Sequence, residues 1–348
     1  MISASSSAPL SPPSSDNEED SNHRIVPGQQ IDADEDLLNE LPNDVDSIEL
    51  VQLRISSIPA LRLDRFTRLQ SLCLRENLIE FIEGLEGVGP SLVELDLYDN
   101  AIERIANLGP EGEEDEGKWL NLESLDLSFN QIRKIKHVSH LRNLKNLYFV
   151  QNRIGKIENL DGLQSLVNLE LGGNRLRVLE NLDSVPSLTQ LWVGKNKITK
   201  MANLSPLKNL KILSIQANRI TKIEGLEDLE ALEELYISHN GLTKIEGLEK
   251  NLNLHILDIT SNAIEHVENL SHLRNLEELW ASSNKISSFD EIEAELKGVE
   301  SLETVYFEGN PIQRENPSTY RNKVRLALGP GLKQIDASMI TESQANIR

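Results

Sequence analysis

The sequence predicts an α/β repeat fold, a solenoid with one parallel sheet along its concave side. The first observation is a recurring phrase with the template L-x-x-L-x-L-x-x-N-x-I-x-x-I-x-x-L. The second is its spacing, because every step from Asn130 to Asn284 is 22 residues. The third is the alternation before each asparagine, as at Leu257 and Ile259, which is the period of a short strand with one buried face. A fixed period of this length indicates stacked coils, and this template is that of a leucine-rich-repeat solenoid.

About twelve repeats fill residues 48–309. The first, Ile48–Ile58, is degenerate and has Leu53 at the asparagine position. The other eleven carry the repeat asparagines, which are Asn77, Asn100, Asn130, Asn152, Asn174, Asn196, Asn218, Asn240, Asn262, Asn284 and Asn310. We expect each asparagine amide to hydrogen-bond backbone groups of adjacent coils that would otherwise be buried and unpaired. The remainder of each repeat is too short for a full helix and should be extended or 3₁₀.

Two insertions interrupt the 22-residue period. The first, between Asn100 and Asn130, contains the acidic run Glu111–Gly117, and the second lies before Asn310, around residues 290–300. Insertions in repeat proteins map to loops between coils. The acidic one is expected to be a solvated bulge, with a secondary contact to a basic partner as the alternative.

The ends of an open solenoid need caps. Residues 1–30 are rich in Ser, Pro and acids and predict a disordered tail. Residues 31–47 form the expected N-terminal cap, and Asp34–Ile48 could be a short helix that closes the first coil. Residues 310–338 form the expected C-terminal cap, and residues 339–348 a loose tail. The cap should contain a helix packed through Tyr320, Val324, Leu326 and Leu328, followed by a return to the sheet edge at Ile335 and Asp336.

Composition narrows the function classes. The net charge of −21 argues against binding to nucleic-acid phosphates and to anionic membranes, and favours a partner with a basic surface. There is a single cysteine, Cys73, so no disulfide can form within the chain, and a reducing compartment is expected. No nucleophile, acid–base or metal-ligand constellation appears, and the seven histidines are scattered. We therefore expect a protein that is not an enzyme and uses no cofactor or metal.

The informative positions are those four residues before each repeat asparagine, which we name the −4 column. They hold five of the eight Trp and Tyr residues of the chain. Strand propensity alone would also enrich the neighbouring outward positions, yet the −6 positions hold no Tyr or Trp and the −2 positions hold only Tyr98. The −4 column is Cys73, Asp96, Asp126, Tyr148, Glu170, Trp192, Ser214, Tyr236, Asp258, Trp280 and Tyr306.

This column predicts a surface that binds a protein partner. Tyr and Trp supply large rigid contact areas and dominate interface hot spots. Carboxylates accompany them within the column and at the −6 positions Glu94, Glu234 and Glu278. Carboxylates beside desolvated rings favour a partner that supplies Arg or Lys.

Several segments resemble a known family, the leucine-rich-repeat regulatory subunits of type-1 protein phosphatase. The segments are Leu125–Ile135, Gly194–Lys200, Leu235–Glu249, Ser301–Pro311 and the cap "YRNKVRLAL…IDA", and the resemblance covers roughly residues 45–338. It implies a non-catalytic subunit whose concave face binds the phosphatase catalytic subunit. The contact positions it implies are Asp126, Tyr148, Glu170, Trp192, Asp258, Glu278, Trp280 and Tyr306. Tyr236 lies in the column but outside that set.

The resemblance further implies roles in phosphatase assembly, nuclear targeting and mitosis, a location in nucleus and cytoplasm, and an inhibitor protein as a possible third component. The short docking motif of many phosphatase regulators, a basic residue, then Val or Ile, any residue, and Phe or Trp, is not found in the sequence. Binding should then depend on the folded solenoid. The rival interpretation is a leucine-rich-repeat scaffold of another assembly, spliceosomal or tubulin-folding.

Overall fold

A computed structural model of the 348-residue chain describes residues 37–108 and 119–340. The predictions for the tail 1–30, the acidic run Glu111–Gly117 and most of the tail 339–348 lie outside these residues. The unit Asp32–Arg348 is described by itself below.

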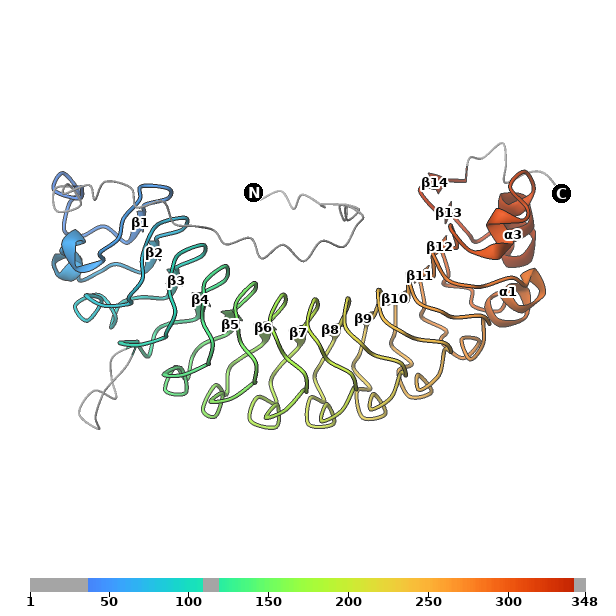
Figure 1. Cartoon of the computed structure of the whole chain (residues 1–348), viewed down its shortest axis with the longest axis horizontal. Coiled ribbons are helices and arrows are strands. Elements are labelled where there is room, and N and C mark those ends of the chain that lie inside the picture. Colours follow the sequence, from blue (N-terminus) through green and yellow to red (C-terminus); the bar gives the residue numbers. More distant parts are fainter. Residues whose placement is uncertain (1–36, 109–118, 341–348) are drawn as a thin grey trace. The chain divides into compact units, whose positions relative to one another are not determined.

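One sheet runs through the described residues. Its strands follow the chain order without a crossover, and they line the concave side of the stacked coils (Figure 1). Neighbouring strands from β1 to β13 pair in parallel, and β14 adds antiparallel. The strands are β1 Ser47–Glu49, β2 Ser71–Cys73, β3 Glu94–Asp96, β4 Ser124–Asp126, β5 Asn146–Tyr148, β6 Asn168–Glu170, β7 Gln190–Trp192, β8 Ile212–Ser214, β9 Glu234–Tyr236, β10 Ile256–Asp258, β11 Glu278–Trp280, β12 Thr304–Tyr306, β13 Gln334–Ile335 and β14 Ser338–Met339. The predicted leucine-rich-repeat solenoid is confirmed.

Each coil buries its apolar residues inside the stack. Leu279 at the centre of β11 is 0% exposed and Ala281 is 1% exposed, whereas Trp280 between them faces outward and is partly exposed. The buried residues form one continuous cluster from Leu38 to Ile335. Because each coil is too thin to bury this surface alone, stacking supplies the core.

The repeat asparagines join each coil to the one before it. Asn152 Nδ2 donates to Leu127 O of the preceding coil at 2.8 Å, and its Oδ1 accepts from Ile132 N at 2.9 Å. The residue before each repeat asparagine has positive φ, at Phe129 (55°) and Ala217 (50°) among others. The chain thus turns in a left-handed conformation, and the asparagine pairs the backbone groups that this turn buries. The expected role of these amides is confirmed.

A second asparagine ladder, which the repeat template did not predict, lies seven residues after the first. Asn159 Nδ2 donates to Ile135 O at 2.6 Å, and Asn181 Nδ2 to Ile157 O at 2.6 Å. Both asparagines also have positive φ (59° and 57°), and a glycine, Gly225 (72°), takes the same place in another coil. This position therefore needs a residue that tolerates the left-handed region, and asparagine adds a bond to the neighbouring coil.

The return segments are mostly turns and extended chain, as expected, with two short 3₁₀ helices, η2 Pro59–Leu61 and η3 Leu63–Arg65. The prediction of a helix over Asp34–Ile48 is wrong for its described part, because residues 37–40 form turns and β1 begins at Ser47. Pro42 cannot donate a backbone hydrogen bond, and Asn43 and Asp44 favour turns. Leu38, 3% exposed, still covers the first coil.

The insertion before Asn310 forms a helix, α1 Phe289–Leu296, where a loop was predicted. Ser288 Oγ accepts from Glu291 N at 3.2 Å and caps the helix, and Ile292 and Leu296 are buried. Four extra residues thus suffice for two helical turns with one apolar side.

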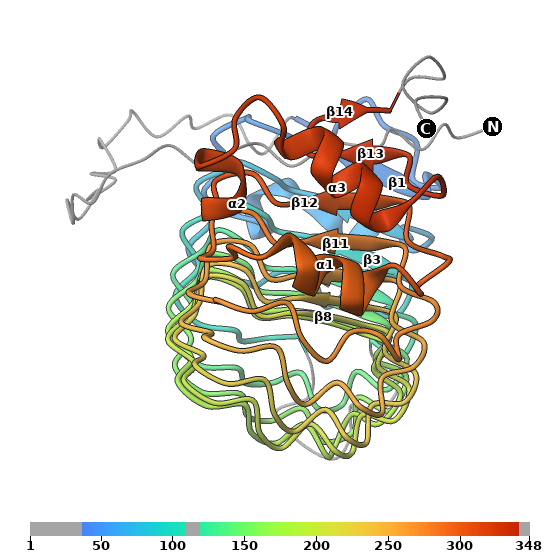
Figure 2. The ribbon, with the colours of Figure 1, turned by 90° about the vertical axis from the view of Figure 1, so that its right-hand side faces the viewer.

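Two further helices complete the C-terminal cap, α2 Pro311–Arg314 and α3 Tyr320–Leu328. Figure 2 shows α3 and α1 at the C-terminal end of the coils, and the two helices are in contact. The predicted helix and the return at Ile335 are confirmed. The prediction that Leu326 packs inward is wrong, because it is 66% exposed and Ala327 is buried in its place. Tyr320 Oη donates to Asp336 Oδ2 at 2.9 Å and fixes the helix to the sheet edge.

Candidate partner-binding surface

The −4 column is a physical line across the sheet. Strand pairing places Tyr148 opposite Asp126 and Glu170 opposite Tyr148, and this register continues to Trp280 opposite Tyr306. All eight predicted contact residues at −4, Tyr236 included, therefore lie in one column. Glu278 projects from β11 at the −6 position, on the same outward side as Trp280.

Four rings of this column touch one another, and we name Trp192, Tyr236, Trp280 and Tyr306 the aromatic ridge. The centroids of Trp192 and Tyr236 are 6.2 Å apart with planes at 20°. Tyr236 and Trp280 are 6.0 Å apart at 57°, and Trp280 and Tyr306 6.0 Å apart at 69°. Strands two places apart are separated by about 10 Å. The first three rings therefore lean across the strands between them.

Two members of the column lie beneath the ridge. Ser214, between Trp192 and Tyr236, is 3% exposed, and Asp258, between Tyr236 and Trp280, is 4% exposed. Asp258 was predicted as a contact residue. In the free protein its carboxylate is instead used internally: Oδ1 accepts from Thr260 N at 3.0 Å and Oδ2 from Gln216 Nε2 at 3.3 Å. Asp258 therefore supports the ridge from below.

The other aspartates of the column make the same internal bond. Asp126 Oδ1 accepts from Ser128 N at 2.8 Å, and Asp96 Oδ1 from Tyr98 N at 3.0 Å. A short acidic side chain can reach the backbone two residues on, which a longer one does not do readily. Aspartate in this column thus pairs a backbone N–H just beyond the strand end, a structural role that its place in the repeat did not predict.

The polar tips of the ridge are held by neighbouring side chains. Trp280 Nε1 donates to Glu278 Oε2 at 2.9 Å, and Tyr236 Oη donates to Glu234 Oε2 at 2.8 Å. Burial, followed by this bond to the carboxylate, raises the pKa of the Tyr236 phenol. The two −6 carboxylates predicted to flank the rings therefore orient them, and keep a second oxygen for a partner.

Two details of the ridge were not visible in the repeat pattern. Gln334 Nε2, from β13 of the cap, donates to Tyr306 Oη at 2.6 Å. The sequence held one signal for this hydrogen bond, the expected return of the chain to the sheet edge at Ile335. That return pairs β13 with β12. The indole Nε1 of Trp192 is buried and has no hydrogen-bond partner among the described residues.

The column continues beyond the ridge with Glu170 and Tyr148. Burial raises the pKa of the Glu170 carboxyl, with a smaller contribution from the negative charge of Asp126, while the Asn168 amide 3.4 Å away opposes the shift. Burial also raises the pKa of the Tyr148 phenol. The surroundings of Glu170 thus offset the negative charge of its ionised carboxylate only in part. A cation from a partner would stabilise this charge.

The described residues contain no cluster of three or more His, Cys, Asp or Glu side chains that could hold a metal ion. Among the helices of residues 37–108 and 119–340, none has the length and apolarity to cross a membrane. What the −4 column does offer is an outward row of rings in contact with one another, with carboxylates at its margin.

The fold is a leucine-rich-repeat solenoid with an aromatic inner face. The family model described as "Leucine Rich repeats (2 copies)" matches residues 120–163, 186–228, 208–250 and 230–274. Solved structures agree on the fold. An internalin from Listeria monocytogenes superposes with a TM-score of 0.63 at 21% identity, covering 85% of this chain and 88% of that one. A leucine-rich-repeat protein of Leptospira interrogans gives 0.61 at 21% identity, covering 81% of each chain.

The chain is also similar to three proteins named as phosphatase regulators. It is 61% identical over 80 residues to the protein phosphatase 1 regulatory subunit SDS22 of Schizosaccharomyces pombe, covering 23% of each chain. The identity to SDS22 of Saccharomyces cerevisiae is 50% over 114 residues, which is 32% of this chain and 31% of that one. Human protein phosphatase 1 regulatory subunit 7 is 56% identical over 46 residues, 13% and 12% of the two chains. The matched stretches span less than a third of these relatives. The resemblance to phosphatase regulatory subunits is confirmed over these stretches, and its extent over residues 45–338 and the implied contact residues stay predictions.

Proposed function

We propose that this protein is a non-catalytic regulatory subunit that binds the catalytic subunit of type-1 serine/threonine phosphatase through its concave face. Two kinds of observation support this proposal. Relatives at 50–61% identity over their matched stretches are named as regulatory subunits of that phosphatase. The concave face carries a surface whose chemistry suits a protein partner with basic side chains.

The aromatic ridge is the observation that carries the proposal. Its four rings are pre-assembled, since three successive centroid pairs lie 6.0–6.2 Å apart. Rings already fixed in place lose little conformational entropy when a partner covers them. Glu278 and Glu234 hold two of the rings and present charge beside them. This combination fits hot-spot binding with flanking ion pairs.

The finer parts of the proposal rest on the family resemblance. They are a role in phosphatase assembly, in nuclear targeting and in mitosis, residence in nucleus and cytoplasm, and an inhibitor protein as a third component of the complex. The chemistry of the concave face supports the phosphatase contact itself.

The experiment is a calorimetric titration of the full chain with purified type-1 phosphatase catalytic subunit. We expect a saturable one-to-one complex. Trp280→Ala removes the ring that touches both Tyr236 and Tyr306. Loss of such an anchor costs about 2–4 kcal/mol, or roughly 30- to 900-fold in affinity.

The matched control is Phe81→Ala, which removes an exposed ring (67% exposed) outside the sheet and away from the −4 column. It should bind like the wild type. Trp280→Phe, which keeps a ring, should retain part of the affinity. Circular dichroism of each variant reports folding. A folded Trp280→Ala protein with wild-type affinity would refute the ridge as the binding surface.

A further inference from the structure

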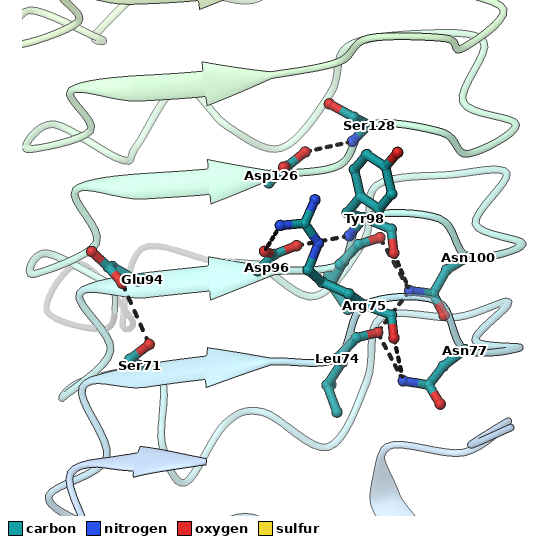
Figure 3. A network of polar contacts seen from close by, with 11 residues as sticks. Ser71, Leu74, Arg75, Asn77, Glu94, Asp96, Tyr98, Asn100, Asp126 and Ser128 are labelled. Atoms are coloured by element: carbon teal, nitrogen blue, oxygen red, sulfur yellow. Dashed lines mark hydrogen bonds and ion pairs between the residues drawn. The ribbon is translucent and has the colours of Figure 1, made fainter. Parts of the chain in front are cut away.

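A second aromatic cluster lies on the N-terminal part of the sheet, outside the −4 column. We name Arg75, Tyr98 and Phe129 the N-terminal patch; Figure 3 shows Arg75 and Tyr98 with the polar network around them. The Tyr98 and Phe129 ring centroids are 4.8 Å apart at 45°, and Arg75 Cζ lies 4.2 Å from the Tyr98 centroid. These side chains follow the ends of β2, β3 and β4, so three adjacent coils build the patch.

Phe129 is unusual for its position. It precedes a repeat asparagine, has φ of 55° and is 40% exposed. A bulky side chain is disfavoured in the left-handed region, and an exposed ring gains little from burial. No other asparagine-bearing repeat has Phe, Tyr or Trp there; the equivalents are Glu76, Asp99, Gln151, Gly173, Lys195, Ala217, His239, Ser261, Ser283 and Gly309. Neither the core nor the repeat explains this ring.

Carboxylates extend from the patch along the same outward side of the sheet, and Glu94 lies at the opposite end of β3 from Tyr98 (Figure 3). Asp96 and Asp126 face each other across β3 and β4, and Glu49 and Glu94 are exposed on β1 and β3. Arg75 Nη1 pairs with Asp96 Oδ2 at 3.4 Å. Burial, together with the charges of Asp126 and Glu94, raises the pKa of the Asp96 carboxyl in spite of Arg75. Among these residues, the four carboxylates Glu49, Glu94, Asp96 and Asp126 thus face the single cation of Arg75.

Arg75 shows the chemistry that the patch recognises. Its guanidinium lies over the Tyr98 ring and pairs with a carboxylate at once. That combination of a cation–π contact and an ion pair is the usual mode of binding an arginine on an acidic aromatic surface. Asp126, whose Oδ1 is engaged by Ser128 N, and the exposed Glu94 offer further acceptor oxygens for a second guanidinium.

We propose that the N-terminal patch is a second docking surface, which binds an extended protein segment carrying arginines and an apolar residue. The apolar side chain packs on Phe129 and Tyr98, and the guanidinium groups pair with Asp126 and Glu94. The charge favours a segment from another protein, because residues 1–36 and 109–118 of this chain are themselves acidic. The aromatic ridge begins at β7, with β5 and β6 between, so the patch rings are separate from the ridge. Asp126 is the one residue of this surface that is also among the contact positions implied by the family resemblance.

The test uses the full chain and a fluorescein-labelled nonapeptide that alternates arginine and leucine, measured by fluorescence anisotropy. We expect saturable one-to-one binding to the wild type, and no binding of the same peptide with glutamate in place of arginine. Phe129→Asn should weaken binding about tenfold or more. This variant should fold, because asparagine tolerates the left-handed conformation better than phenylalanine.

Two controls separate this surface from others. Phe81→Asn also exchanges an exposed ring for asparagine, but away from the sheet, and should leave the affinity unchanged. Trp280→Ala removes a ridge ring and should also bind the peptide normally. Absence of saturable binding, equal affinity for Phe129→Asn, or loss of binding in Trp280→Ala would each overturn the proposal. None of these results depends on whether the phosphatase binds.

Discussion

The residue four places before each repeat asparagine decides what its coil presents to a partner. Large rings occupy alternate coils at Trp192, Tyr236 and Trp280, and the coils between carry the compact residues Ser214 and Asp258. A ring can lean over the column residue of the next coil only if that residue is small or is held in place by a hydrogen bond. Ser214 is small, and Asp258 is held by Thr260 N. The alternation therefore lets rings about 10 Å apart at the backbone come into contact.

Glu170 gives a prediction at this scale. Burial raises the pKa of its carboxyl above the ordinary value of 4.5, so the ionised form destabilises the folded state. Glu170→Gln removes that charge and should increase the free energy of unfolding at pH 7. The stability contribution of protonated Glu170 is present below pH 4.5 and lost as pH rises through the raised pKa. The advantage of the variant should therefore vanish at pH 4 and below.

Urea unfolding of both proteins at pH 7 and in acid measures the effect. Glu103→Gln, which removes an exposed charge from the return segment of another coil, is the matched control and should show no comparable gain. A Glu170→Gln protein that is less stable than wild type at pH 7 would contradict the assigned cause of the shift.

The role of the column aspartates could be predicted from the sequence only in part. Their place in the −4 column follows from counting, and their acidity suggested a partner. The bond from Asp258 Oδ1 to Thr260 N, repeated at Asp126 and Asp96, depends on the local backbone after each strand. That geometry is not encoded in a repeat template, although the shortness of aspartate relative to Glu170 was a usable signal.

Among the elements, strands were predictable and α1 was not. Alternation before an asparagine identifies each strand, because burying one side is what the coil requires. The insertion around α1 was assigned to a loop because repeat insertions usually are loops. Its sequence nevertheless contains Ser288 followed three residues later by Glu291, which is a helix-start signal. The structure uses Ser288 as the cap.

The acidic side of α1 ties it to the preceding coil, which gives a second prediction. Glu295 Oε2 accepts from Leu270 N at 2.9 Å and from Ser271 N at 3.1 Å. Glu295→Ala leaves these backbone donors without the carboxylate and should cost about 1–3 kcal/mol of unfolding free energy. Urea denaturation followed by circular dichroism measures the loss.

Glu293→Ala is the control on the same helix. Glu293 is exposed and pairs with Lys297 at 2.6 Å, four residues on, so its loss should cost only about 0.3–0.5 kcal/mol. Glu295→Gln keeps an acceptor oxygen and should recover part of the stability. Equal effects of Glu293→Ala and Glu295→Ala would show that α1 does not depend on this attachment.

At the scale of the whole solenoid, the residues that stabilise the fold and the residues proposed to bind the partner belong largely to different groups. The core and the asparagine bonds hold the coils together. Charged pairs along the strand entrances, such as Lys145–Glu123 at 2.8 Å and Lys211–Glu233 at 2.8 Å, have side chains about 40–50% exposed. Exposed pairs of this kind contribute about 0–1 kcal/mol each. The exposed charges at the strand entrances can therefore vary at little cost to the fold, unlike the buried Ser214 and Asp258 of the −4 column.

The large-scale features were predictable to the extent that they repeat. Strand order, the −4 register and the inward residues follow from a 22-residue period. The ring contacts of the ridge could not be predicted, because two of the three join coils two places apart and all of them depend on how each ring tilts. The hydrogen bond from Gln334 to Tyr306 could not be predicted either, because Gln334 belongs to the cap, where the repeat period has ended.

The central claim is that the aromatic ridge is the surface that a type-1 phosphatase covers. Hydroxyl-radical footprinting with mass spectrometry tests it directly, because tyrosine, tryptophan and phenylalanine side chains are oxidised according to their exposure. The chain is oxidised alone and with excess catalytic subunit, and Phe81, which is exposed away from the sheet, is the internal reference. We predict that oxidation of Trp192, Tyr236, Trp280 and Tyr306 falls several-fold in the complex while that of Phe81 is unchanged. Equal oxidation of the ridge in the free and bound protein, under conditions where the complex forms, would contradict the account.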